Sequence, residues 1–150
     1  MQQRLVVVGR GEPLLAEYES RFIERIRRFA PFELIEIAAG RERRREQRCQ
    51  QEGRRILTRC QGHLLVLFDE RGEAVTSQGW ADFLRTLSGG ASVDYIIGGA
   101  GGVDSSLRQE CRQCWRLSAL TLPHHLARAM VLEQLYRAHT IISGHPYHRE

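Results

Sequence analysis

Four glycines, Gly98, Gly99, Gly101 and Gly102, follow a short apolar segment at 95–97. Glycine permits positive φ angles and lets a ligand approach the backbone closely. The spacing matches neither GxGxxG nor GxxxxGK[ST], and the chain contains no lysine, which the second motif requires. Dinucleotide and nucleoside triphosphate sites of these types are therefore disfavoured. The glycine run is either a wall of a different ligand pocket or a tight turn only.

The C-terminal segment HPYHRE at 145–150 combines groups that could hold a nucleobase and its phosphate. A histidine beside a reacting base can act as an acid, a base or a stacking surface. Tyr147 and Arg149, on either side of His148, add an aromatic ring and a guanidinium, on which RNA bases stack. The alternative is a terminus without fixed structure.

The histidines and cysteines do not have the spacing of a metal site. Five of the six histidines lie from His124 onward, but no HExxH motif occurs, so they are interpreted as a polar rim. Cys111 and Cys114 have CxxC spacing, but Cys49 and Cys60 do not supply a second zinc-binding pair. The CxxC also falls late in a predicted helix, unlike a redox motif. We predict no metal and interpret the thiols as packing groups.

Length and composition indicate one globular domain over residues 1–150. The hydrophobic fraction is 42% and the charged fraction is 27%, both ordinary values for such a domain. No run of eighteen apolar residues occurs, so no membrane-spanning helix is expected. The start MQQRLVVVGRGEP has too short an apolar core for a signal peptide. We expect a cytoplasmic protein.

The net charge of +4 comes from arginine alone, because the chain lacks lysine. Eight arginines lie between Arg41 and Arg59, among several glutamates. One interpretation is a solvated helix with many ion pairs. The other is a face that binds RNA phosphates. No aromatic residue lies among these arginines, so base stacking is not indicated.

Apolar periodicity predicts five strands that alternate with five helices. The predicted strands are 4–9, 32–38, 63–69, 94–97 and 116–120. The predicted helices are 13–29, 41–59, 77–87, 104–114 and 126–142. Ser77 and Asp104 are the expected N-caps, and the third helix is expected to stop at 88–90.

This alternation predicts an α/β fold with a mostly parallel sheet and right-handed crossovers. The alternating segment 32–38 is typical of a strand near an edge, and the apolar segment 63–69 is typical of a central strand. The stretch 95–125 would then line a pocket for a small ligand at the carboxyl edge of the sheet.

Four segments together resemble the RlmH (YbeA) family of SPOUT-class ribosomal RNA methyltransferases. They are YIIGGAGG (95–102), LSALTLPH (117–124), EQLYRA (133–138) and HPYHRE (145–150). Segments 32–39 and 64–69 fit as well, so the resemblance runs nearly end to end. The combination of LSALTLPH with HPYHRE is highly specific, whereas the glycine turn alone is not.

The resemblance implies a single-domain SPOUT (α/β-knot) fold whose C-terminal part forms a trefoil knot. Nothing in the sequence pattern itself shows a knot, and knots are rare in general. The resemblance also implies S-adenosylmethionine as the cofactor, bound within the knot. The implied cofactor-binding residues are Phe68, Gly99, Ser118, Ala119, Leu120, Thr121, Leu122 and Pro123.

The resemblance further implies a homodimer in which the tail of one subunit meets the cofactor of the other. The substrate would be a pseudouridine of 23S ribosomal RNA, methylated at N3, in the assembled ribosome. His148 is the first candidate to assist the loss of the N3 proton, and Tyr147 is the second. Arg137 and Arg149 would orient the base or a phosphate, and Glu133 would hold one of these arginines.

One departure from the family concerns Gly101, where many relatives carry an acidic or polar residue. The extra glycine predicts a looser turn. Two other classes of function remain open on the residues alone. One is a non-enzymatic RNA- or ribosome-binding factor on an α/β scaffold, and the other is a zinc or redox protein that uses Cys111 and Cys114.

Overall fold

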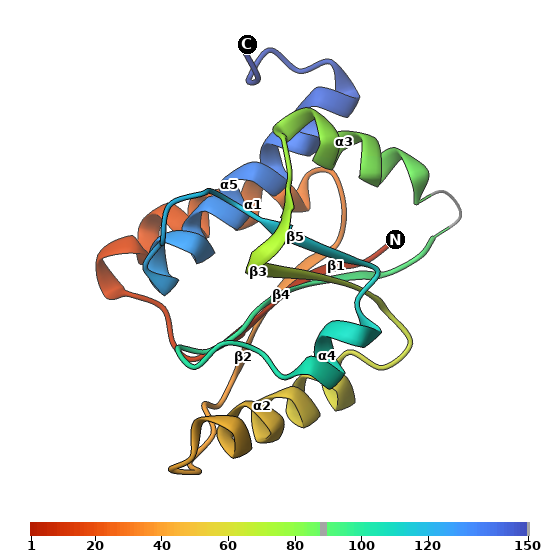
Figure 1. Cartoon of the computed structure of the whole chain (residues 1–150). Coiled ribbons are helices and arrows are strands. Elements are labelled where there is room, and N and C mark those ends of the chain that lie inside the picture. Colours follow the sequence, from red (N-terminus) through yellow and green to blue (C-terminus); the bar gives the residue numbers. More distant parts are fainter. Residues whose placement is uncertain (88–89, 150) are drawn as a thin grey trace.

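A computed structural model describes residues 1–87 and 90–149 of the chain (Figure 1). Its five strands form one parallel sheet in the order β2-β1-β4-β3-β5. The strands are β1 (Gln3–Val8), β2 (Phe32–Ile37), β3 (Leu64–Ala74), β4 (Val93–Ile97) and β5 (Gln113–Arg116). The helices are α1 (Ala16–Arg27), α2 (Arg45–Arg59), α3 (Ser77–Thr86), α4 (Ser105–Glu110) and α5 (His124–Ser143), and a short 3₁₀ helix, η1 (Pro13–Leu15), precedes α1. The predicted α/β class is confirmed.

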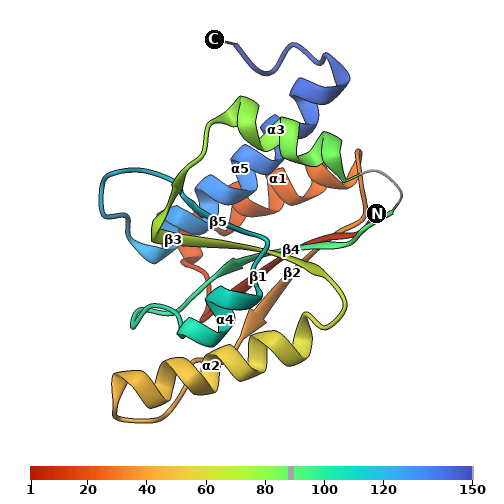
Figure 2. The ribbon, with the colours of Figure 1, turned by 45° about the vertical axis from the view of Figure 1, so that its right-hand side comes forward.

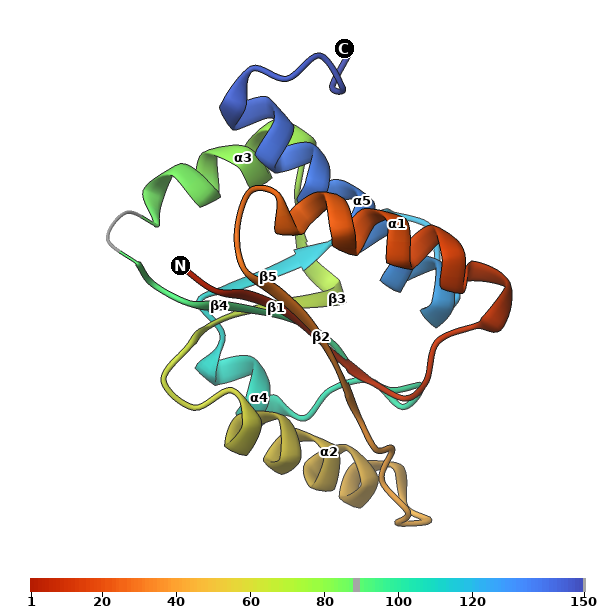
Figure 3. The ribbon, with the colours of Figure 1, turned by 180° about the vertical axis from the view of Figure 1, so that it is seen from behind.

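Helices cover both faces of the sheet (Figures 1, 2 and 3). Helices α1, α3 and α5 lie on one face, and α2 and α4 lie on the other. Successive side chains of a strand point to opposite faces, so β1 contributes to two cores. Leu5 and Val7 pack with the first group of helices, whereas Val6 and Val8 pack with the second. No helix in the described ranges is long and apolar enough to cross a membrane.

The strand positions follow from the apolar patterns. β1 and β4 are buried along their whole length, as interior strands covered on both faces should be. β2 lies at an edge of the sheet and alternates between buried and exposed residues, which confirms the prediction for 32–38. β3 lies inside the sheet, as its apolar first half predicted. The trefoil knot stays a prediction.

The predicted helix 104–114 and strand 116–120 are wrong in their bounds. α4 already ends at Glu110, and β5 begins at Gln113. The reason is Trp115, which is buried and lies opposite Phe68 in the register of β5 and β3. Its ring lies 5.4 Å from that of Trp80, centroid to centroid, so aromatic packing determines where the strand forms. Cys114 therefore belongs to a strand.

The helix caps differ in part from the prediction. Thr76, and not Ser77, caps α3 by accepting a hydrogen bond from the N–H three residues on, at 2.9 Å. Ser77 instead donates to Gln134 on α5 at 2.5 Å. Asp104 is the N-cap residue of α4, but its side chain makes no capping bond. The predicted stop at 88–90 includes two residues outside the described ranges, and α2 begins at Arg45 rather than at 41.

A buried ion pair joins β1 to β4 beneath the end of α2. Asp94 is fully buried and accepts from Arg4 Nε at 2.7 Å and from Arg4 Nη2 at 2.6 Å. His63 Nδ1 lies 3.0 Å from the same carboxylate. Hydrogen bonding to Asp94 raises the pKa of Arg4. Arg4 Nη2 also donates to the carbonyl of Arg59 at 3.1 Å, so three elements meet at one charged pair.

Removing one partner of this pair should destabilise the fold strongly. Asp94→Ala leaves the Arg4 guanidinium buried without its counter-charge, which costs roughly 3–5 kcal/mol. Urea unfolding followed by circular dichroism measures the loss. The double variant Arg4→Met, Asp94→Leu removes both charges and should unfold near the wild-type midpoint. Equal destabilisation of the two variants would show that packing, and not charge, is responsible.

Candidate functional site

A cleft of about 480 Å³ opens at the carboxyl end of β4 and beside the middle of β3, where residues 68–71 lie. Phe68 from β3 and Ile97 from β4 form apolar parts of its wall, and Ala127 at the start of α5 adds a third. The glycine turn and the loop 117–123 lie on either side. A smaller cavity of about 90 Å³ adjoins the cleft and shares these three residues. The pocket predicted for 95–125 at this edge of the sheet is therefore present.

Most of the implied cofactor-binding residues line these two cavities. Gly99 and Thr121 line the larger one, Ser118 and Leu120 line the smaller one, and Phe68 and Leu122 line both. Ala119 is exposed, and Pro123 is the N-cap residue of α5. Neither of them lines these cavities.

The loop 118–122 leaves most of its backbone groups without protein partners. Among the described residues, the backbone of this loop makes one hydrogen bond, from the Leu120 N–H to the Ser118 hydroxyl at 2.9 Å. Backbone N–H and C=O groups are strong hydrogen-bonding groups that need a partner when they are covered. A ligand in the cavities could supply such partners.

The glycine turn requires glycine because protein atoms crowd it. A Cβ on Gly98 would lie 2.5 Å from Val103 Cγ1. A Cβ on Gly99 would lie 2.9 Å from Glu52 Oε1 and 3.2 Å from Val8 Cγ1. Gly102 has a φ angle of +91°, which a residue with a side chain rarely adopts. The turn is thus packed against the protein on its outer side and open to the cleft on its inner side.

Helix α2 holds this turn from outside. Arg45 Nε donates to the Gly101 carbonyl at 2.6 Å, and the Cys49 thiol lies 3.4 Å from the same oxygen. The buried Glu52 carboxylate accepts from the Gly40 N–H at 2.8 Å, which fixes it beneath the turn. The looser turn expected from Gly101 is therefore restrained by contacts with α2. Arg45 also lines the cleft itself.

The sequence interpretation missed Arg45, Cys49 and Glu52 as residues of the site. A signal was present, because Cys49, Glu52 and Ile56 recur at spacings of three and four within the arginine run. All three are buried in the structure. An apolar cysteine on one face of a highly charged helix indicates that this face packs against something.

His124 and Asp69 add polar groups to the cleft. His124 Nε2 is buried and has no hydrogen-bond partner among the described residues. Burial, and then the neighbouring His125, lower the pKa of His124, so its imidazole is neutral at pH 7. Asp69 forms an ion pair with Arg108, and both line the cleft.

Four of the five predicted catalytic residues form one cluster at the C-terminal half of α5. Arg137 donates to Glu133 Oε1 from Nε at 2.9 Å and from Nη2 at 2.6 Å. The Tyr147 hydroxyl donates to the same oxygen at 3.0 Å. Burial, together with this hydrogen bond, raises the pKa of Tyr147 to about 12. Tyr147 therefore carries its proton at neutral pH.

Arg137 also determines which ring nitrogen of neutral His148 carries the proton. The guanidinium lies over the Tyr147 ring at 4.8 Å and contacts His148 Nδ1 through Nη1 at 3.2 Å. Arginine has donors only, so Nδ1 accepts and the imidazole proton of neutral His148 lies on Nε2. Arg149, the fifth predicted residue, is exposed, and its side chain makes no hydrogen bond within the described ranges.

The cluster and the cleft lie at different places on the chain. Ala127 lines the cleft, and Arg137 lies ten residues further along α5, about 15 Å at the rise of an α-helix. The cluster instead borders a pocket of about 460 Å³ between α1 and α5, which Tyr18 and Leu126 also line. No described residue lines both places. Figures 1 and 2 show the chain end far from the loop 117–123.

Cys49 and Cys60 are buried, and Cys111 and Cys114 are partly buried. Burial raises the pKa of Cys60, and it raises the pKa of Cys111 to about 12. Such thiols carry little thiolate at neutral pH and are poor nucleophiles. Within the described ranges, no group of three or more His, Cys, Asp or Glu side chains could hold a metal ion.

Proteins of similar sequence share one name. A chain from Beijerinckia indica is 38% identical over 159 residues and covers 99% of both sequences. One from Methylobacterium is 41% identical over 160 residues and covers 99% of this chain and 98% of its own. One from Neisseria meningitidis is 50% identical over 101 residues, 66% of this chain and 65% of its own. Each is named ribosomal RNA large subunit methyltransferase H.

Solved structures share the fold at low sequence identity. A "Probable Methyltransferase" from Bordetella pertussis aligns with a TM-score of 0.59 at 12% identity, covering 91% of this chain and 93% of its own. A "probable methylase family protein" from Haemophilus influenzae aligns with a TM-score of 0.57 at 9% identity, covering 99% and 70%. A family model described as "Predicted SPOUT methyltransferase" matches residues 1–148. The resemblance noted from four short segments is thus confirmed over nearly the whole chain, which belongs to the SPOUT methyltransferase family.

Proposed function

We propose that residues 1–150 form one SPOUT domain, knotted at its C-terminal part, that methylates N3 of a pseudouridine in 23S ribosomal RNA. The methyl donor is S-adenosylmethionine, and the substrate is the assembled ribosome in the cytoplasm. The observation that carries the proposal is the cleft whose lining includes Phe68, Gly99 and the loop 118–122. The names of the relatives support large-subunit ribosomal RNA as the substrate class.

The cleft fits the proposed methyl donor in size and chemistry. Its volume of about 480 Å³ lies within the usual range for small-ligand sites. The apolar side chains of Phe68 and Leu122 suit an adenine ring, and the free backbone groups of 118–122 suit its polar edge. The buried, unpaired His124 Nε2 offers a further polar contact. When bound, S-adenosylmethionine supplies an activated methyl group.

Glu133, Arg137, Tyr147 and His148, here called the tail cluster, assist the loss of the N3 proton in this proposal. Tyr147 is protonated and donates to Glu133, so it positions Arg137 rather than acting as a base. His148 Nδ1 is occupied by Arg137. An RNA phosphate that binds the Arg137 guanidinium would release Nδ1, which could then accept the proton. Arg149 remains free to orient the base or a second phosphate.

A second copy of the chain would bring the cluster to the cleft. Leu14 is 90% exposed, and Tyr18 and Leu126 are 40% and 47% exposed, on and beside α1 and α5. Exposed apolar residues that gather next to a functional cluster are typical of an interaction surface. We place the homodimer contact here, with the tail of one subunit completing the cleft of the other.

The Gly99→Ala variant should bind S-adenosylmethionine about 5- to 150-fold more weakly. The added Cβ must displace the fixed Glu52 carboxylate or the turn, and overpacking of this kind costs about 1–3 kcal/mol. Isothermal titration calorimetry measures the affinity. Gly53→Ala is the matched control, because its Cβ would make an ordinary contact at 3.5 Å. Equal affinities of the two variants would contradict the placement of the donor.

The His148→Ala variant should lower the single-turnover methylation rate by about 10²–10⁴-fold and remove one ionisation from its pH profile. Its affinity for S-adenosylmethionine should change much less than the rate, because the walls proposed to hold the donor, Phe68, Gly99 and the loop 118–122, stay intact. Ribosomes from cells that lack the gene are the substrate. Tyr147→Phe serves for comparison and should retain the profile's shape. A full rate for His148→Ala at every pH would exclude it as the proton acceptor.

Mixing two impaired variants tests the shared site, at an S-adenosylmethionine concentration that saturates the wild type but not Gly99→Ala. The mixed dimer of Gly99→Ala and His148→Ala chains has one intact cleft facing one intact tail. After subunit exchange, the mixture should reach about a quarter of wild-type activity, because half of the dimers are mixed and each has one working site. Activity equal to the sum of the separate variants would instead place both groups of residues within one subunit.

A further inference from the structure

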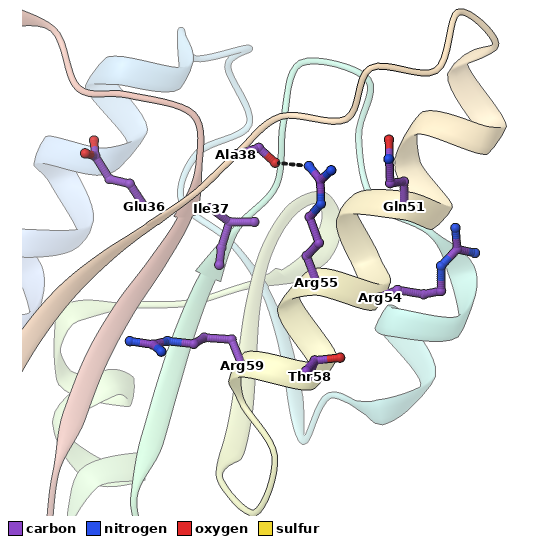
Figure 4. A pocket seen from close by; sticks show the side chains of 8 residues that line it. All are labelled: Glu36, Ile37, Ala38, Gln51, Arg54, Arg55, Thr58 and Arg59. Carbon is purple, nitrogen blue, oxygen red and sulfur yellow. Dashed lines mark hydrogen bonds between the residues drawn. The ribbon is translucent and has the colours of Figure 1, made fainter.

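Another concave surface, separate from the cleft, lies between the end of β2 and helix α2 (Figure 4). This groove has a volume of about 750 Å³. Ile37 and Ala38 line one side of it, and the other side consists of α2 residues between 51 and 59. None of its lining residues takes part in the cleft or in the tail cluster.

The groove is positively charged. Arg54, Arg55 and Arg59 line it, and Glu36 is the one carboxylate among its lining residues. Glu36 accepts from Arg128 Nη1 at 2.7 Å, and this hydrogen bond is the main cause of its lowered pKa. Figure 4 shows Glu36 pointing away from Arg54 and Arg55. The carboxylate is thus neutralised elsewhere, and the arginines set the charge of the groove.

The five arginines of α2 divide into two groups by their contacts. Arg45 binds the glycine turn, and Arg48 Nη1 lies 3.4 Å from the Glu42 carbonyl. By contrast, the side chains of Arg54 and Arg59 make no hydrogen bond or ion pair within residues 1–87 and 90–149. Arg55 is anchored by Nη1 to the Ala38 carbonyl at 2.7 Å, which leaves its Nε and Nη2 donors free. Among the arginines of α2, the uncommitted donors therefore lie at the groove.

We propose that this groove binds the sugar-phosphate backbone of an RNA duplex. The three guanidinium groups point in different directions (Figure 4), which suits successive phosphates better than a single small anion. No aromatic residue lines the groove, so stacking of unpaired bases is not favoured. The Thr58 hydroxyl and the Gln51 amide NH₂ can bind 2′-hydroxyl groups, which duplex RNA displays.

The position of the groove connects it with the candidate site. Helix α2 begins with Arg45, which lines the cleft, and Arg59, which lines the groove, follows fourteen residues later, about 21 Å along the axis and about 40° around it. An RNA duplex lying along α2 therefore extends from the groove to the mouth of the cleft. This inference rests on the proposed function, which identifies the nucleic acid as ribosomal RNA. It adds the surface that binds this RNA.

Two double variants of equal charge test the groove. Arg54→Gln, Arg59→Gln removes two groove cations, and Arg28→Gln, Arg112→Gln removes two exposed arginines that do not line it. The probe is a fluorescein-labelled 20-base-pair RNA duplex, with affinity measured by fluorescence anisotropy from 50 to 200 mM KCl. The groove variant should bind about tenfold more weakly at 100 mM salt. Its slope of log K against log salt should fall by about 1–2.

The control variant should lose less than about threefold in affinity. Equal losses in the two variants would mean that only the net charge matters, and this would overturn the proposal. Unchanged RNA binding in the groove variant would overturn it as well. A change only in sedimentation behaviour would assign the groove to a protein contact instead.

Calorimetry with S-adenosylmethionine separates this inference from the proposed function. Both double variants should bind it like the wild type, because the altered residues do not line the cleft. Failure of the wild-type chain to bind it would overturn the proposed function. The RNA titrations would still decide the groove.

Discussion

The fit of the glycine turn against α2 is the constraint on which the cleft depends. The turn approaches the helix so closely that a Cβ on Gly99 would lie 2.9 Å from Glu52 Oε1, and it folds back so tightly that a Cβ on Gly98 would lie 2.5 Å from Val103 Cγ1. On the helix side, Arg45, Cys49 and Glu52 hold or abut the turn from one stripe. The remaining wall, the loop 118–122, has few internal hydrogen bonds of its own. The glycine turn is thus a restrained wall of the cleft, whereas the loop 118–122 leaves most of its backbone groups available to a ligand.

Much of the fold could be predicted because its signals are local. The alternation in 32–37 predicted an edge strand, and the apolar run from 64 predicted an interior one. The fifth strand was misplaced because its position depends on Trp115 packing against Phe68 and Trp80, which are distant in sequence. The capping role of Thr76 was missed because Ser77 beside it is an equally good cap by residue type.

The site was predictable where a short motif carries it and not where distant elements meet. The four glycines and the segment 117–124 identified the cleft, and HPYHRE identified the tail cluster. The contacts from Arg45 and Cys49 were not foreseen, because the charge of their helix favoured a solvated or RNA-binding face. Residue spacing alone does not give the separation of His148 from the cleft, which depends on where α5 ends. The resemblance had implied it, because it places the tail of one subunit at the cofactor of the other.

The two ends of helix α2 have different contacts, so they tolerate substitutions during evolution to different degrees. Substitutions at Arg54 or Arg59 leave the buried stripe of Cys49, Glu52 and Ile56 untouched. Substitutions near Arg45 alter the turn directly. Arg54 and Arg59 can therefore change during evolution without altering the shape of the cleft. Residues near Arg45, at the other end of the same helix, cannot.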